Sequence, residues 1–190
     1  CSSTGFFGAE NVIIELAKEM KLLGHDPVIG IFNNLYNPHL ELAAEAKKNN
    51  IKLHIFPCRK QFDLSTVINI RSFLKSNNVN ILHTHGYKTN FYGLLGSTRE
   101  TVKVATNHMW IKSDLKSKIY CMLDSVLIRF YKKIIAVSDP IRHDMMKKGI
   151  LSDKIIVIYN GIDTERFKNK HNIEKIKAQL EEAGAQVEVK

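Results

Sequence analysis

The stretch that decides the fold is VNILHTHGYKTNFYGLLGSTRETVKVATN, residues 79–107. A short apolar run at 79–85 is followed by a helix-forming segment near 88–97 and by a second apolar run at 102–106. Neither junction carries the two-residue turn of a β-hairpin, and a helix is the usual crossover between two parallel strands. The stretch therefore predicts a strand–helix–strand unit with parallel strands.

The same alternation continues along the chain in both directions. It predicts further strands at 26–32, 51–56, 133–138, 154–160 and 186–189, and further helices near 8–24, 38–49, 64–76, 114–130, 140–148 and 173–183. Helices that alternate with parallel strands cover both faces of a sheet. We therefore expect an α/β fold, a Rossmann-like, doubly wound, mainly parallel sheet of about seven strands with helices on both faces.

Composition and charge narrow the classes of partner. The 190 residues are 44% hydrophobic and 25% charged, which is typical of a globular protein. Lys and Arg outnumber Asp and Glu by 28 to 19, and the net charge of +9 favours anionic partners such as nucleotides, phosphates or acidic lipids. A basic surface that maintains solubility explains the charge equally well. The basic residues are spread along the chain without a nucleic-acid-binding module, so we expect no nucleic-acid partner.

The cysteines and the apolar runs predict where the protein works. Cys1, Cys58 and Cys121 are an odd number without metal-ligand spacing, which favours a reducing compartment. No apolar run is long enough to span a bilayer, and no signal-peptide pattern is present. We expect a cytoplasmic protein, with peripheral contact at the inner face of a membrane as an extension of that expectation. Neither a metal nor another cofactor is expected.

Four segments follow or replace strand ends, where doubly wound sheets bind their ligands. The first, CSSTGFFGAE, places Gly5 and Gly8 directly before a helix whose free N–H groups could bind phosphate. A plain tight turn explains two glycines as well. Such a loop normally follows a buried strand, and none precedes it in the sequence.

The second and third segments carry histidines. His83 and His85 lie two residues apart and therefore face the same side of a strand. His85 could hydrogen-bond a sugar or phosphate or act as an acid or base, whereas a half-buried structural histidine or a metal pair are the alternatives. Asn107 and His108 follow the next strand and could reach the same cleft.

The fourth segment, AVSDPIRHDMMKKG, begins a helix. Ser138 or Asp139 is expected to cap that helix, with Pro140 in its first turn. Further along, Asn160 and Gly161 follow a strand and indicate a turn or a hinge.

An apolar stripe with helical spacing runs through residues 110–133, and it has two interpretations. It is either the core face of a packed helix, which is the commoner case, or a face that lies on an anionic membrane. The stripe comprises Leu115, Ile119, Met122, Leu123, Val126, Leu127 and Phe130, and it is flanked by Lys112, Lys116, Lys118, Arg129, Lys132 and Lys133.

Residues 2–167 resemble the N-terminal domain of the GT-B-type, family 4 retaining glycosyltransferases. The resemblance rests on four segments in the same order: GFFGAENVIIELAKEMKLLGHDP, ILHTHGYKTNFYGLLG, IIAVSDPIRHDMMKKG and KIIVIYNGIDTERF. It implies transfer of a sugar, with retention, from a nucleotide-sugar donor to a sugar-containing acceptor, without a metal.

The resemblance also implies roles for single residues. Gly8 would approach the donor diphosphate, and His85 would be the catalytic histidine that touches the transferred sugar. Asn107 and His108 would border the acceptor or donor-sugar pocket. The pair Asn160 and Gly161 would mark the passage to a second domain. Gly5 and Ser138 complete the set of substrate-binding candidates.

The C-terminal tail departs from that family. Family members carry a second Rossmann-like domain that holds most donor contacts, whereas KAQLEEAGAQVEVK resembles the end of the bacterial ribosomal stalk protein L7/L12. This predicts a truncated, engineered or recombined chain, with a glycosyltransferase domain at 1–167 and a helix–strand tail at 168–190 that completes it. The strand at 186–189 would replace the missing first strand, between the strands at 26–32 and 79–85.

The expected functions follow from this arrangement. The isolated chain would be a hexosyltransferase fragment with residual ligand affinity and little or no turnover of its own, because the donor domain is absent. A free-standing nucleotide- or phosphate-binding module and a chimeric domain without catalytic function are the alternatives. Exchange of the last strand between two chains would produce a homodimer.

Overall fold

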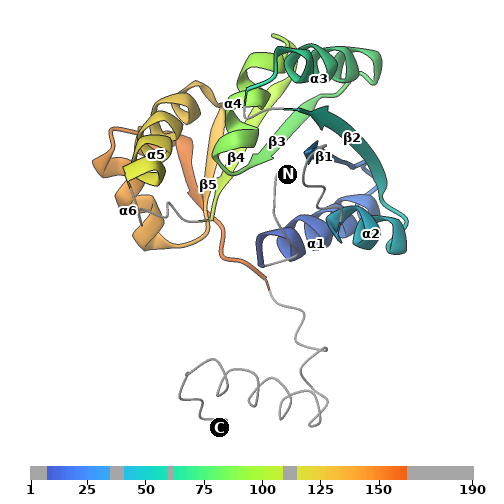
Figure 1. Cartoon of the computed structure of the whole chain (residues 1–190). Helices are drawn as coiled ribbons and strands as arrows, with labels where there is room; N and C mark the ends of the chain where they lie inside the picture. Colours follow the sequence, from blue (N-terminus) through green and yellow to red (C-terminus); the bar gives the residue numbers. More distant parts are fainter. Residues whose placement is uncertain (1–7, 35–40, 60–61, 109–114, 162–190) are drawn as a thin grey trace, which may run out of the picture. The chain divides into compact units, whose positions relative to one another are not determined.

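The structure is a computed structural model that describes residues 8–34, 41–59, 62–108 and 115–161 (Figure 1). The chain divides into two compact units, Cys1–Tyr159 and Asn160–Lys190, and the described elements lie in the first. They are α1 (Gly8–Leu22), β1 (Val28–Asn34), α2 (Glu41–Lys48), β2 (Lys52–Cys58), α3 (Leu64–Ser76), β3 (Ile81–His85), α4 (Tyr87–Gly96), β4 (Val102–Asn107), α5 (Leu115–Leu127), β5 (Lys133–Ala136), α6 (Asp139–Lys147) and β6 (Ile155–Val157), with short 3₁₀ turns η1 (Ile128–Phe130) and η2 (Ser152–Lys154).

All paired strands run parallel, which confirms the predicted α/β class. β1 pairs with β2, and a four-stranded sheet has the order β3-β4-β5-β6. The described part of the chain thus contains six strands, one fewer than the number expected from the sequence. The predicted seventh strand, at 186–189, and the predicted helix at 173–183 lie outside the described residues.

The strand limits differ from the predicted ones at their carboxyl ends. β1 continues through Asn33 and Asn34, which pair with Pro57 and Cys58, because polar residues at a strand end can still take part in the ladder. β6, in contrast, ends at Val157, although the apolar pattern extends to Tyr159. Tyr159 is exposed. An apolar residue at this position was therefore not enough to extend the strand.

The helices end where the backbone turns left-handed. Gly24 follows α1 with a φ of +85°, which confirms the predicted stop, and the N–H of His25 donates back to the carbonyl of Met20. Asn50 and Asn78 take the same conformation after α2 and α3. Asparagine tolerates this conformation better than most residues, so these positions close each helix before the next strand.

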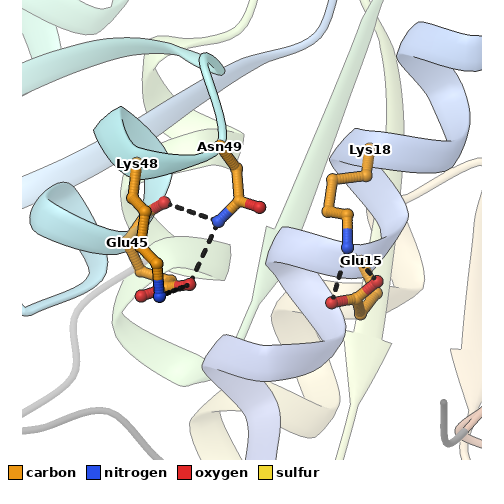
Figure 2. Close-up of polar contacts among 5 residues, drawn as sticks. All are labelled: Glu15, Lys18, Glu45, Lys48 and Asn49. Atoms are coloured by element: carbon orange, nitrogen blue, oxygen red, sulfur yellow. Dashed lines mark hydrogen bonds and ion pairs between the residues drawn. The ribbon is translucent and has the colours of Figure 1, made fainter. Parts of the chain in front are cut away.

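Helices cover both faces of the paired strands β1 and β2. α1 and α2 pack on one face, where Ile13 of α1 belongs to the same core as Ile29 and Ile31 of β1. α3 packs on the other face, where Ile70 lies in a core with Phe56 of β2. The outward sides of α1 and α2 carry charged pairs, such as the Lys18–Glu15 and Lys48–Glu45 pairs shown in Figure 2.

α4 connects the β1–β2 pair to the four-stranded sheet. Its Tyr92 ring lies 5.0 Å from the ring of Phe32 in β1, and the Tyr92 hydroxyl accepts a 2.7 Å hydrogen bond from the Asp63 N–H. On the far side of α4, the Tyr131 hydroxyl donates to the carbonyl of Asn90 at 2.7 Å. Tyr92 and Tyr131 are both fully buried, and Tyr92 shares a core with Phe56 of β2 and Leu82 of β3, so α4 packs against both sheets.

β1 and β3 each have one partner strand among the described residues. Within the described ranges, β1 pairs only with β2, and β3 pairs only with β4. The strand predicted at 186–189 lies outside the described residues, so its place between the strands at 26–32 and 79–85 stays a prediction.

The apolar stripe of α5 does not face the core, so the core interpretation is wrong. Six of its large side chains are 46–75% exposed: Leu115, Ile119, Met122, Leu123, Val126 and, in η1, Phe130. The buried side of the helix instead carries Cys121, Asp124 and Ser125. Among the described residues, no helix has the length and hydropathy needed to cross a membrane.

Candidate functional site

Three histidines gather at the carboxyl ends of β3 and β4. The two strands are parallel neighbours with His85 opposite Thr106, so alternation places His83, His85, Thr106 and His108 on one face. His83 Nε2 lies 2.7 Å from Thr106 Oγ1, and His85 Nδ1 lies 3.2 Å from His108 Nε2. The His83 and His85 rings are 4.3 Å apart, centre to centre.

The turn after β3 presents His85 to this edge. Gly86 directly follows His85 with a φ of +95° and precedes the first residue of α4. Most residues with a side chain are strained in this conformation, whereas glycine is not. The chain can therefore leave the strand abruptly, and His85 remains at the edge where ligands of parallel sheets bind.

The contact between His85 and His108 restricts their protonation. One imidazole must donate and the other must accept, so the pair shares a single proton along the hydrogen bond. Within the part of the chain that the structure describes, His85 Nε2 and His108 Nδ1 have no protein partner. These two nitrogens can therefore contact a ligand. The hydrogen bond between the two rings holds both of them in position.

Burial lowers the pKa of all three histidines. It lowers the pKa of His83 to about 4, with a further contribution from the charge of His108. Burial also holds the pKa of His85 well below its usual value and lowers that of His108. At neutral pH the cluster is therefore uncharged, which suits hydrogen bonding by the neutral rings rather than ion pairing.

The start of α1 lies within electrostatic reach of this cluster. The carboxylate of Glu10, which is only 4% exposed, acts to raise the pKa of His108 against the effect of burial. Gly8 begins the same helix, and a Cβ at Gly8 would meet no atom of the described residues within 4 Å. The first and third predicted segments thus come together, while Gly5 lies outside the described residues.

Sequence reasoning missed Glu10. The signal was present, because Glu10 occupies the buried stripe of α1 together with Ile13, Ile14 and Ala17, with spacings of three, four and seven residues. A carboxylate at such a position is rarely buried without a purpose or a partner.

Asn107 is adjacent to His108 in sequence but points to the other face of β4. It is 7% exposed, and its Nδ2 has no hydrogen-bond partner among the described residues. Asn33 Oδ1, near the carboxyl end of β1, is likewise buried without a partner there. Leaving such a group unpaired costs about 1–3 kcal/mol, so both amides are candidate ligand contacts, and Asn33 was not identified from the sequence.

The remaining predicted site residues lie outside the histidine cluster. Ser138 is the N-cap of α6 and Pro140 lies in the first turn, as predicted, but the Ser138 side chain makes no capping hydrogen bond. Asp139 is the first residue of α6 rather than its cap, and its carboxylate accepts a 2.6 Å hydrogen bond from the Tyr159 hydroxyl. Asn160 and Gly161 are exposed and open the second unit.

A surface recess of about 460 Å³ lies elsewhere in the same unit. Half of its lining residues are basic, namely Arg71 and Lys75 of α3, Arg99 of the α4–β4 connection and Lys103 of β4, and Glu100 adds one carboxylate. Lys103 is near the amino end of β4, so this recess is at the opposite end of the strand from the histidines. Among the described residues, no group of three or more His, Cys, Asp or Glu side chains could hold a metal ion.

Comparisons with solved structures show which fold this is. HepE of Anabaena, in complex with UDP and glucose, superposes with a TM-score of 0.73 at 19% identity, over 95% of this chain and 48% of HepE. A glycosyltransferase from Rickettsia africae gives a TM-score of 0.63 at 24% identity, over 90% of this chain and 45% of its own. The UDP-GlcNAc 2-epimerase of Neisseria meningitidis gives 0.55 at 16% identity, over 94% and 52%.

The chain therefore spans about half the length of the solved structures that it matches. No curated protein matches it significantly by sequence. The family model of Glycosyltransferase Family 4 matches residues 7–166, which is most of the chain. The fold agrees with the Rossmann-like N-terminal domain of GT-B enzymes, as the sequence resemblance implied. On these findings, the chain belongs to Glycosyltransferase Family 4.

Proposed function

We propose that this chain is the acceptor-side domain of a retaining glycosyltransferase, which moves a sugar from a nucleotide-sugar donor to a sugar-containing acceptor. The observation that carries the proposal is the His85–His108 hydrogen bond at the carboxyl ends of β3 and β4. The site lies where doubly wound sheets bind ligands, and the start of α1 is within electrostatic reach of it.

His85 is the proposed contact to the transferred sugar. Its neutral ring can donate to, or accept from, a sugar hydroxyl through Nε2, while His108 holds Nδ1 at 3.2 Å. His108 and Asn107 border the sugar pocket from opposite faces of β4. The backbone amides at Gly8 receive the donor diphosphate, since the first N–H groups of a helix are free to bind anions.

The donor is proposed to be a UDP-sugar. HepE of Anabaena was solved with UDP, with UDP and glucose, and with UDP-glucose. The net charge of +9 suits a diphosphate ligand. Ser138, Asn160 and Gly161 follow β5 and β6 and are proposed to face the donor half of the site.

The 190 residues alone are proposed to bind ligand without efficient turnover. Transfer requires donor and acceptor to be held together in one geometry, and the solved GT-B structures are about twice as long as this chain. In this proposal, residues 1–167 form the acceptor-side domain, and 168–190 complete its sheet.

A free-standing phosphate-binding module is the second candidate. The position of Gly8 at the first residue of α1 favours it, because the free N–H groups of a helix start could bind any phosphate without a sugar. The two candidates differ in whether the sugar contributes to affinity.

Isothermal titration calorimetry with UDP, UDP-glucose and glucose separates these functions. We expect UDP-glucose to bind more tightly than UDP, and His85→Ala to remove that difference, a loss of about tenfold or 1.4 kcal/mol. His25→Ala, at an exposed site, is the matched control and should bind like the parent chain. Equal affinity for UDP and UDP-glucose would favour the phosphate module, and no binding of any ligand would refute both.

A further inference from the structure

The helix α5 presents its apolar side to solvent and its polar side to the protein. Successive residues of an α-helix are rotated by roughly 100°, so Leu115, Ile119, Met122, Leu123 and Val126 fall within a stripe only roughly 100° wide. All five are at least 46% exposed, and Phe130 of η1, at 66%, continues the stripe. This is the reverse of an ordinary surface helix.

Buried polar contacts hold α5 in this orientation. The Asp124 carboxylate is 3% exposed and accepts a 2.7 Å hydrogen bond from Asn90 Nδ2 of α4. Asn90 Oδ1 in turn accepts from Thr84 Oγ1 of β3 at 2.5 Å. Turning the stripe inward would expose Asp124 and leave Asn90 without this partner, so the outward orientation is set by the buried network.

Basic side chains border the exposed stripe. Lys118, Arg129, Lys132 and Lys133 are exposed, whereas Asp124, the one carboxylate within α5 and η1, is buried. Arg129 and Lys133 donate to the backbone carbonyls of Lys148 and Asp153, which leaves their positive charges unneutralised. Lys118 and Lys132 form no ion pair within the described ranges.

The stripe is too large to be an ordinary surface feature. Six large apolar side chains, each at least 46% exposed, present on the order of several hundred Å², the size of patch that marks an interaction site. On α1 and α2, by contrast, the outward sides carry the charged pairs of Figure 2. Other described elements also expose apolar side chains, such as Leu22 and Leu23 at the end of α1, but α5 and η1 gather six of them along one stripe.

We propose that α5 and η1 lie flat on an anionic membrane surface. The apolar stripe would be buried at the boundary between the lipid headgroups and the acyl chains, and the basic side chains would contact the lipid phosphates. A helix with an apolar face and a basic border is the kind that binds this interface. Charge complementarity favours lipid over an apolar protein groove, since an uncharged groove would leave the basic border without a function. This surface is independent of the histidine site.

Vesicle co-sedimentation of the whole chain tests the proposal. We expect binding to vesicles of phosphatidylcholine with about 30 mol% phosphatidylglycerol, weak binding to pure phosphatidylcholine, and a decrease at high salt. The double variant M122E/V126E should lower the partition constant by about tenfold or more, because it places two charges in the stripe.

The double variant L22E/L23E is the matched control, since Leu22 and Leu23 are 78% and 72% exposed at the end of α1. It should bind vesicles like the parent chain, and circular dichroism should show that both variants fold. Equal loss in both variants, or no binding of the parent chain to anionic vesicles, would overturn the proposal. Self-association that M122E/V126E abolishes, without vesicle binding, would assign the stripe to a protein interface instead.

Discussion

His83 couples the fold to pH. Its pKa is lowered to about 4 by burial and by the charge of His108, whereas the same side chain in the unfolded chain titrates near 6.5. Above about pH 6.5 neither state binds the proton. Between that value and about 4, the unfolded state binds it and the folded state does not, so stability decreases as the pH falls through this window.

Urea unfolding at pH 7 and pH 5 measures this effect. We expect His83 to account for a loss of about 2 kcal/mol between the two pH values. His83→Gln should reduce the pH dependence by that amount, since glutamine can keep a contact with Thr106 but does not titrate. His25→Gln, at an exposed position, should retain the full pH dependence. An unchanged slope in His83→Gln would show that the ring is not buried in the neutral form.

At the residue scale, the site was partly predictable. His85 and His108 were identified because each follows an apolar strand, and parallel strands end at the same edge. Their contact depends on the register of β3 and β4, which pairs His85 with Thr106 and which a sequence does not state. The same register sends Asn107 to the other face, so the neighbour of His108 is not its partner.

At the scale of elements, close packing makes α4 the most constrained helix. A Cβ at Gly96 would lie 2.7 Å from Ile70 Cγ2 and 3.2 Å from the Val67 carbonyl oxygen, both in α3. A Cβ at Gly93 would lie 2.7 Å from Thr84 Cγ2 of β3. The two glycines therefore allow α4 to approach a helix on one side and a strand on the other.

Gly96→Ala tests this packing. Alanine stabilises a helix by about 1 kcal/mol relative to glycine, whereas overpacking costs about 1–3 kcal/mol. We expect overpacking to win, because the backbone carbonyl of Val67 cannot move without distorting α3, so urea unfolding should show a net loss of about 1–2 kcal/mol. Gly8→Ala, where a Cβ meets open space, should cause no loss. Stabilisation by Gly96→Ala would refute the close approach of α3 and α4.

The orientation of α5 shows where prediction from sequence stopped. Helical periodicity correctly identified the apolar stripe, but it could not show which side of the helix packs on the protein. That choice is made by the contact of Asp124 with Asn90, residues 34 positions apart. A long-range hydrogen bond of this kind leaves no local pattern.

At the scale of the whole molecule, the parallel α/β architecture was predictable because buried parallel strands are continuous apolar runs between helices. The described strands appear in the predicted order, with ends displaced by a few residues. The apolar pattern of the sequence did not show which strands are neighbours in the sheets. The observed pairing leaves β1 and β3 with one partner each within the described ranges.

The central claim is that a Glycosyltransferase Family 4 domain holds its sugar ligand at the His85–His108 pair. Histidine side-chain NMR during a titration with UDP-glucose tests it directly, because each imidazole reports its own tautomer and contacts. We predict that the ring nitrogens of His85 and His108 shift together, while those of the exposed His25 and His143 do not. Saturating UDP-glucose that leaves both rings unchanged, while amide signals around Arg71 and Arg99 of the basic recess shift, would contradict the claim.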